Sequence, residues 1–165
     1  MLSSREATKK LALYPTLFGE IRQPNSNYFV IPKTSSEKRT YIPLGFLDSK
    51  VIANSELFML PDATLYHFGI LTSMMHMSWV RSTCGRLESR YRYSKDIVYN
   101  NFPWPDVSEK DTKKIEVLAQ AVLDARLEFS ESSLADLYDP RTMPPALVRA
   151  HTELDRAVDK LYKPT

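Results

Sequence analysis

Residues 81–105 read RSTCGRLESRYRYSKDIVYNNFPWP, and charged side chains alternate with apolar ones across positions 87–93. Successive side chains of a strand point to opposite faces. An extended strand here places Glu88, Arg90 and Arg92 on one face and the leucine and tyrosines on the other. One face can pack on a core, while the other presents charged groups that need a partner or water.

The charged face has two interpretations. An arginine guanidinium matches the two acceptors of guanine in a bidentate fork, and a carboxylate accepts a hydrogen bond from the amino group of cytosine. The strand can therefore read base edges in a DNA groove. Alternatively, it is a solvated edge strand in which Glu88 pairs with a neighbouring arginine, because runs of surface charge commonly face only solvent. The pattern by itself leaves both interpretations open.

Charge is unevenly distributed along the 165 residues. The chain is 43% apolar and 25% charged, as is typical of a folded globular protein of one or two small domains. Residues 1–104 contain 13 Lys and Arg against 8 Asp and Glu, whereas residues 105–165 contain 9 against 12. The net charge of +2 thus combines a basic part with an acidic part. This asymmetry favours a module that faces a polyanion, followed by a solvated helical support.

The single cysteine, Cys84, excludes an internal disulfide and favours an intracellular location. No secretory signal is recognisable at the N-terminus, and no run of about 18 apolar residues predicts a membrane span. The sequence therefore predicts a cytoplasmic protein with no membrane partner.

The region before the quoted stretch has the amino-acid composition of several short strands. Strands are predicted at residues 28–32, 40–46, 50–54 and 57–60, with a polar turn at 34–39. Prolines interrupt several of them and cannot donate to a ladder. These features predict a small, twisted antiparallel sheet.

Helices are predicted on both sides of this region. Residues 3–12 predict a short helix capped by Ser3 or Ser4. The most apolar segment, residues 64–80, predicts one helix capped by Asp62 or Thr64. Within it Gly69 is expected to allow the close approach of another element. A turn at Gly85 then leads into the alternating strand, and residues 97–105 predict a further strand that ends in an aromatic and proline-rich corner.

Only helices are expected after this corner. Ser108 is predicted to cap a helix of about 20 residues, and Pro144 and Pro145 open a last helix after a loop at residues 130–143. Both helices carry an apolar stripe, which predicts an antiparallel hairpin packed against the sheet. The predicted class is α+β: a small twisted antiparallel sheet with a packed apolar helix, followed by a C-terminal helical hairpin.

The sequence predicts no catalytic or metal site. His67 and His76 are not at the one-turn spacing that places two ligands on one helix face, and His151 lies in another helix. Two nearby arginines can lower the pKa of Cys84, but no base or orienting group accompanies this thiol. The four glycines form no loop that cradles phosphates.

Two longer segments resemble a known family. They are FGILTSMMHMSWVRSTCGRLESRYRYSKDIVYNNFPWP (68–105) and SLADLYDPRTMPPALVRAHTELDRAVDKLY (133–162). Both closely resemble the C-terminal part of the MmeI-like DNA methyltransferases, which are single-chain type IIL restriction–modification enzymes. IPKTSSEKRTYIP (31–43) and VIANSELFML (51–60) look like the preceding part of the family's target-recognition domain.

The resemblance implies a division of labour within a longer chain. Members of the family carry an N-terminal nuclease, a helical connector and an adenine methyltransferase core that uses S-adenosylmethionine. This sequence resembles only the two regions C-terminal to that core: residues 1–107 are expected to be the C-terminal portion of the target-recognition domain, and residues 108–165 the C-terminal helical domain. The expected partners are double-stranded DNA and the parent's nuclease and methyltransferase domains, in a bacterial or archaeal cell. S-adenosylmethionine and Mg²⁺ are expected to bind those other domains, leaving this segment without catalytic residues or metal ligands.

The resemblance also favours the DNA interpretation of the charged strand. The side chains expected to read bases are Glu88, Arg90, Arg92, Lys33, Ser55 and Glu56. The side chains expected to hold phosphates are Lys38, Arg39, Arg81, Arg86 and Lys95. The alternative from a different class is a protein–protein interaction or scaffold segment that acts through its acidic helical hairpin, residues 108–162.

Overall fold

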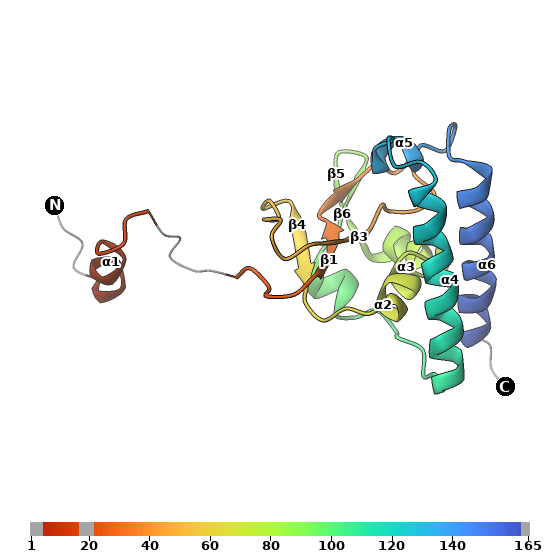
Figure 1. The fold of residues 1–165 in the computed structure, drawn as a ribbon, viewed down its shortest axis with the longest axis horizontal. Helices are drawn as coiled ribbons and strands as arrows, with labels where there is room; N and C mark the ends of the chain where they lie inside the picture. Colours follow the sequence, from red (N-terminus) through yellow and green to blue (C-terminus); the bar gives the residue numbers. More distant parts are fainter. Residues whose placement is uncertain (1–4, 17–21, 163–165) are drawn as a thin grey trace.

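The computed structural model describes residues 5–16 and 22–162, and its helices and small antiparallel sheets confirm the predicted α+β class (Figure 1). The strands are β1 (Tyr28–Pro32), β2 (Thr34–Ser35), β3 (Gly45–Leu47), β4 (Leu57–Leu60), β5 (Gly85–Leu87) and β6 (Arg90–Arg92). The helices are α1 (Glu6–Leu11), α2 (Leu65–Leu71), α3 (Met74–Thr83), the π-helix η1 (Lys95–Tyr99), α4 (Glu109–Leu127), α5 (Leu134–Leu137) and α6 (Pro145–Leu161). The caps predicted for the first helix, Ser3 and Ser4, lie outside the described residues.

The strands form two three-stranded antiparallel sheets instead of one. β1 is central in the order β3-β1-β4, and β6 is central in the order β2-β6-β5. Lys33 joins the two sheets, because its N–H donates to the Glu56 carbonyl at 2.9 Å and its carbonyl accepts the Tyr93 N–H at 2.8 Å. The chain thus passes from one sheet to the other within one residue, which brings the start of β4 beside the end of β6.

The single strand predicted across residues 87–93 is instead a hairpin. β5 and β6 pair with Leu87 opposite Arg90, and Glu88 and Ser89 form the turn. Glu88 has a φ of 57°, a left-handed conformation that costs a non-glycine residue about 1–2 kcal/mol. Leu87 therefore shares a face with Arg90 and is exposed, and the turn predicted at Gly85 is wrong because this residue lies in β5. The turn lacks the Asn-Gly or Asp-Gly pair by which short hairpins are recognised in a sequence.

Other predicted boundaries are also wrong. β2 lies within the predicted turn 34–39, only β3 is a strand within 40–46, and no strand is described at 50–54. The segment 97–105 continues η1 and then runs without regular structure, and α5 lies inside the predicted loop 130–143. Short apolar runs beside prolines have a strand-like composition, but proline lacks the N–H that a ladder needs.

The helix predicted over residues 64–80 is broken in two. Ser73 ends α2 and begins α3, because its hydroxyl donates to the Ile70 carbonyl at 2.7 Å and accepts the His76 N–H at 3.3 Å. A serine that bonds to the neighbouring backbone in this way competes with a continuous helix. At the start of α2 the N-cap is Thr64, one of the two caps predicted, and not Asp62.

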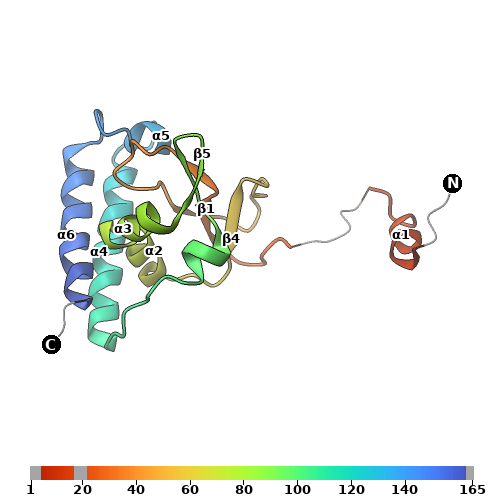
Figure 2. The same ribbon diagram turned by 180° about the vertical axis from the view of Figure 1, so that it is seen from behind.

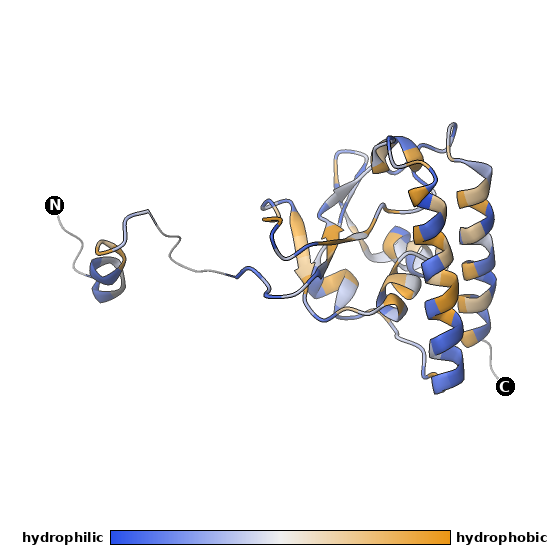
Figure 3. Cartoon of the chain, viewed as in Figure 1, coloured by the Kyte–Doolittle hydropathy of each residue, from blue (hydrophilic) through white to orange (hydrophobic). Residues whose placement is uncertain are grey.

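α4 and α6 form the predicted antiparallel pair and lie side by side at one edge of the molecule (Figures 1 and 2). Ser108 caps α4 by accepting the Asp111 N–H at 3.2 Å, and α6 begins at Pro145, both as predicted. Hydrophilic and hydrophobic residues alternate along both helices (Figure 3). Gly69 of α2 packs against α4 so closely that an added Cβ would lie 2.6 Å from Cγ2 of Ile115. Glycine is therefore needed at the approach predicted for it.

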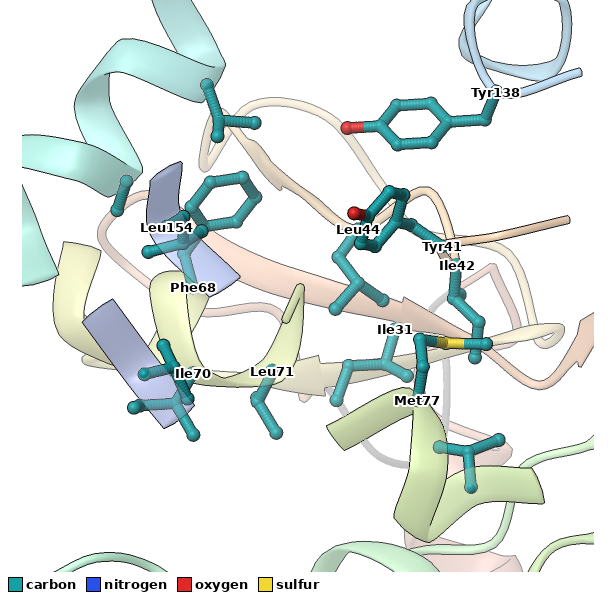
Figure 4. Close-up of a cluster of buried hydrophobic side chains, with 14 of the residues drawn as sticks. Ile31, Tyr41, Ile42, Leu44, Phe68, Ile70, Leu71, Met77, Tyr138 and Leu154 are labelled. Atoms are coloured by element: carbon teal, nitrogen blue, oxygen red, sulfur yellow. The ribbon is translucent and has the colours of Figure 1, made fainter. Parts of the chain in front are cut away.

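One hydrophobic core joins the sheets to the C-terminal helices. Figure 4 shows side chains from β1, α2, the α5 region and α6 meeting around the segment between β2 and β3; among them are Ile31, Leu44, Phe68, Tyr138 and Leu154, none more than 3% exposed. Because these large apolar side chains are buried in one shared cluster, the sheets and the C-terminal helices depend on each other for stability.

A buried polar network crosses the same core. Arg126 of α4 donates from Nη1 to the Leu44 carbonyl at 2.7 Å and from Nε to the Tyr138 hydroxyl at 2.8 Å. Its Nη2 donates to the same hydroxyl. The hydroxyl therefore donates its own proton to Nε2 of His151, 2.7 Å away, which makes His151 neutral with its proton on Nδ1. Burial, and to a lesser degree the charge of Arg126, lowers the pKa of His151 to about 3.

A second polar link lies beside this network. The Tyr41 ring stacks on His151 with centroids 4.0 Å apart, and its hydroxyl donates to Oδ2 of Asp155 at 2.6 Å. Oδ1 of Asp155 accepts the Met74 N–H at 2.7 Å. Burial raises the pKa of the Asp155 carboxyl. Through these contacts α6 holds both the loop after β2 and the start of α3 in place.

Candidate nucleic-acid interface

Arg90 and Arg92 lie on one face of β6, and the burial of Tyr91 between them shows that this face points away from the core. Tyr91 is 4% exposed and Tyr93 is 3% exposed, so the opposite face packs on the core. Residues two apart in a strand are separated by about 6.6 Å, and bases along one DNA strand by about 3.4 Å. The backbone positions of the two arginines are therefore spaced like base pairs two steps apart.

Four of the predicted base-reading residues come together at the junction of the two sheets. We call them the Arg92 cluster: Lys33, Ser55, Glu56 and Arg92. Nη1 of Arg92 donates to Oε2 of Glu56 at 3.0 Å, and the Lys33 ammonium donates to the Ser55 carbonyl. The cluster presents a guanidinium, an ammonium and a carboxylate at one place, which are the groups that recognise guanine and cytosine edges.

The other two predicted base-reading residues form a pair at the tip of the hairpin. Nη2 of Arg90 lies 2.8 Å from Oε2 of Glu88, and the two side chains are 46% and 76% exposed. Exposed ion pairs of this kind contribute about 0–1 kcal/mol. This pairing of Glu88 with a neighbouring arginine is the contact expected of a solvated strand, and its small stabilisation leaves both groups able to turn to another partner.

Thr34 is a residue that the sequence did not indicate. Its Oγ1 accepts a hydrogen bond from Nη1 of Arg92 at 2.8 Å, and β2 places it directly opposite Arg92 in the ladder. Thr34 and Glu56 thus both accept from Nη1 and together orient the guanidinium. The signal was hidden because residues 34–39 have the composition of a polar turn.

The predicted phosphate-binding residues make separate local contacts. Arg86 lies on the face of the hairpin opposite Arg92, with its guanidinium carbon 4.2 Å from the centre of the Tyr91 ring. Arg81 donates to the Thr40 carbonyl at 3.3 Å, next to the end of α3. Lys95 lies 3.9 Å from a carboxylate oxygen of the adjacent Asp96.

Lys38 and Arg39 occupy the loop that follows β2. They line a notch together with Arg141, which belongs to the acidic C-terminal region and was not predicted as a binding residue. No sequence pattern marked Arg141, which lies within the predicted loop 130–143.

The structure offers no support for chemistry at the remaining candidates. Burial raises the pKa of the Cys84 thiol and outweighs the charge of Arg86, so the predicted lowering is wrong. His76 is buried and donates from Nδ1 to the Leu71 carbonyl at 2.8 Å, while its Nε2 faces the Tyr93 hydroxyl at 3.0 Å. Within residues 5–16 and 22–162, no three His, Cys, Asp or Glu side chains are grouped closely enough to hold a metal ion. In the same ranges no helix combines the length and the apolar character that crossing a membrane requires.

The apolar stripes of the C-terminal hairpin pack against other elements of this chain. Ile115, Val122 and Leu154 are at most 1% exposed because α4 and α6 pack on each other and α4 packs on α2. The large apolar side chains that α4 exposes, Val117 and Leu127, lie in different turns. Single exposed apolar residues are normal for a protein surface.

Comparisons with known proteins agree with the resemblance seen in the sequence. The model of the family described as MmeI, target recognition domain, matches residues 1–106, and that of MmeI, C-terminal domain, matches residues 107–165. DNA methyltransferase A of Bacillus subtilis (strain 168) is 40% identical over 161 residues, which are 98% of this chain and 18% of that protein. The solved structure of the type IIL restriction–modification enzyme MmeI in complex with DNA matches with a TM-score of 0.88 at 48% identity.

That match covers 99% of this chain and 22% of the MmeI chain. The chain therefore spans only about a fifth of the length of each of these two relatives. Because family models match the whole sequence, the resemblance is confirmed. The chain belongs to the MmeI family, and the models of the family's target recognition domain and C-terminal domain match its two parts.

Proposed function

We propose that this chain is the sequence-specific DNA recognition module of a protein that both methylates adenine in DNA and restricts DNA. The observation that carries the proposal is the match of residues 1–106 to a target recognition domain, within which an exposed and a half-buried arginine share one face of a strand. The MmeI structure, which was solved in complex with DNA, supports DNA as the partner.

In the proposed complex β6 enters the major groove with Arg90 and Arg92 toward the bases. A two-stranded ribbon fits this groove, and an arginine fork donates to N7 and O6 of guanine. Glu56 and Glu88 have two roles: they hold the arginines before binding, and they can accept from the amino group of cytosine when the arginines turn away. Because the ion pairs are exposed, exchanging them for base contacts costs little.

The proposal assigns catalysis to regions of the relatives outside the matched segment. S-adenosylmethionine and Mg²⁺ would bind there, in methyltransferase and nuclease domains with which this module would act in the cytoplasm of a bacterial or archaeal cell. The described side chains of this chain supply no donor set for a metal ion. This module would determine where on DNA the other domains act.

The proposal is tested by measuring the binding of the chain to random-sequence duplex DNA by fluorescence anisotropy across a salt series. We expect affinity to fall by orders of magnitude between about 50 mM and 200 mM salt if several phosphates are contacted. As a control, Lys110→Gln removes an exposed cation of α4 that is not among the predicted DNA contacts, and it should leave the salt dependence unchanged. Absence of binding at low salt, or binding that salt does not weaken, would contradict the proposed function.

A further inference from the structure

A notch of about 540 Å³ lies between the loop that follows β2 and the loop that follows α5. It is lined by Ser36, Lys38, Arg39, Ala135, Asp139, Pro140 and Arg141. Three of these side chains are cationic and one is a carboxylate, so the lining has a net charge of +2. The notch is built from both family regions, because Lys38 and Arg39 belong to the target recognition domain and Arg141 to the C-terminal domain.

The cationic side chains of the notch have hydrogen-bond donors without partners among the described residues. Arg141 uses Nε and Nη2 to bind the two carboxylate oxygens of Asp139, each at 3.2 Å, and its backbone N–H also donates to Oδ1 at 2.9 Å. This fork fixes the plane of the guanidinium and leaves Nη1 without a hydrogen-bond partner among the described residues. The side chains of Lys38 and Arg39 likewise have no hydrogen bond or ion pair in the described part of the chain.

The single carboxylate of the notch does not neutralise it. The side-chain hydrogen bond from Arg141, and more weakly the charge of Arg39, hold the pKa of Asp139 below its usual value, so it is ionised. The other nearby carboxylates, Glu37 and Asp136, do not line the notch, and Asp136 accepts from the Ser133 hydroxyl at 2.6 Å. Like charges gathered at one concave place, with donors unused, are suited to an anion with several acceptor oxygens.

The position of the notch relates it to the strand that carries Arg92. α5 and β5 lie at the same end of the molecule, the upper end in Figures 1 and 2. Thr34 is opposite Arg92 in the β2–β6 ladder. Lys38 follows Thr34 by four positions, so their Cα atoms lie within about 14 Å. The major groove of B-DNA is about 12 Å wide, so this distance is short enough for one duplex to meet both Arg92 and the notch.

We propose that Lys38, Arg39 and Arg141 together hold a backbone phosphate of the bound DNA, so that the C-terminal domain contacts DNA directly. This inference rests on the proposed function. The contact would fix the register of β6 in the groove without itself reading sequence, as phosphate contacts do. Asp139 would act as a positioning residue that presents the Arg141 fork.

The test is the salt dependence of binding of the full chain carrying Arg141→Gln, measured on random-sequence duplex DNA. Each phosphate contact contributes about 0.9 to the slope of log K against log salt, so the slope is expected to become shallower by about that amount. With equal affinities at 1 M salt, a slope difference of about 0.9 makes the affinity of Arg141→Gln about eightfold lower than that of the unsubstituted chain at about 0.1 M salt. The loss should be equal for every DNA sequence.

Arg149→Gln is the matched control, because this arginine is exposed on α6 and does not line the notch. It should leave both slope and affinity unchanged. If the unsubstituted chain binds DNA with a steep salt dependence and Arg141→Gln binds identically, the inference is overturned while the proposed function stands. If the unsubstituted chain shows no salt-dependent binding, both are overturned.

Discussion

Tyr138→Phe is expected to lower the free energy of unfolding by about 2–3 kcal/mol, because hydrogen bonds to a buried charged group contribute more than ordinary ones. The lost hydroxyl accepts two donors of Arg126, which is 8% exposed, and donates to Nε2 of His151. Phenylalanine fills nearly the same volume, so the loss comes from unsatisfied polar groups and not from a cavity. Urea denaturation followed by circular dichroism measures it.

A double-mutant cycle separates this cause from general damage to the core. Arg126→Met removes the charge and keeps much of the volume, so in that background Tyr138→Phe should cost about 1 kcal/mol, as for an ordinary hydrogen bond. A cost that is equally large in both backgrounds would contradict the role given to the Arg126 charge. So would a loss of less than about 1 kcal/mol in the otherwise unsubstituted chain.

Acid is expected to destabilise the fold through two buried histidines. Burial lowers the pKa of His76 to about 4 and that of His151 to about 3, whereas an unfolded histidine has a pKa of about 6.5. Below pH 6.5 the unfolded chain therefore binds protons that the folded chain does not bind. Above pH 6.5 neither histidine lowers the stability of the fold. As the pH falls below 6.5, each histidine lowers the free energy of unfolding by about 1.4 kcal/mol per pH unit until its folded pKa is reached.

The raised pKa of Asp155 acts in the opposite direction, because its folded state binds protons more readily than the unfolded chain. The histidine contribution is therefore measured by comparing variants. His151→Gln, whose side-chain amide can accept from Tyr138, should reduce the dependence of unfolding free energy on pH by about one proton between pH 6.5 and 4. His67→Gln, at a partly exposed position, should change it less. An unchanged pH dependence in His151→Gln would show that this imidazole is not held neutral.

The sequence predicted the C-terminal half of the fold well because its signals are local. Ser108 before an apolar-periodic run and Pro145 at a helix start each act through neighbouring backbone groups. The prediction for Gly69 also held, since a glycine inside a helical pattern has few other uses.

The sheets were predicted less well because their pairing depends on distant residues. Lys33 bonds to the backbone of Glu56 on one side and Tyr93 on the other, and no local pattern specifies these partners. The Glu88-Ser89 turn needs a positive φ that its residue types do not suggest. Among the site residues, Arg90 and Arg92 were correctly placed on one face, whereas the contacts of Arg92 with Thr34 and Glu56 required the two sheets to be assembled first.

The most direct test of the central claim, that β6 reads DNA sequence, is selection of bound duplexes from a randomised pool by the unsubstituted chain and by Arg92→Ala. We expect the unsubstituted chain to enrich a defined site that contains guanine. Arg92→Ala should lose about 1–3 kcal/mol of preference at one base pair and keep the rest, while Lys110→Ala on α4 should keep the whole site. Enrichment of no sequence by the unsubstituted chain, or an unaltered site with Arg92→Ala, would contradict the claim.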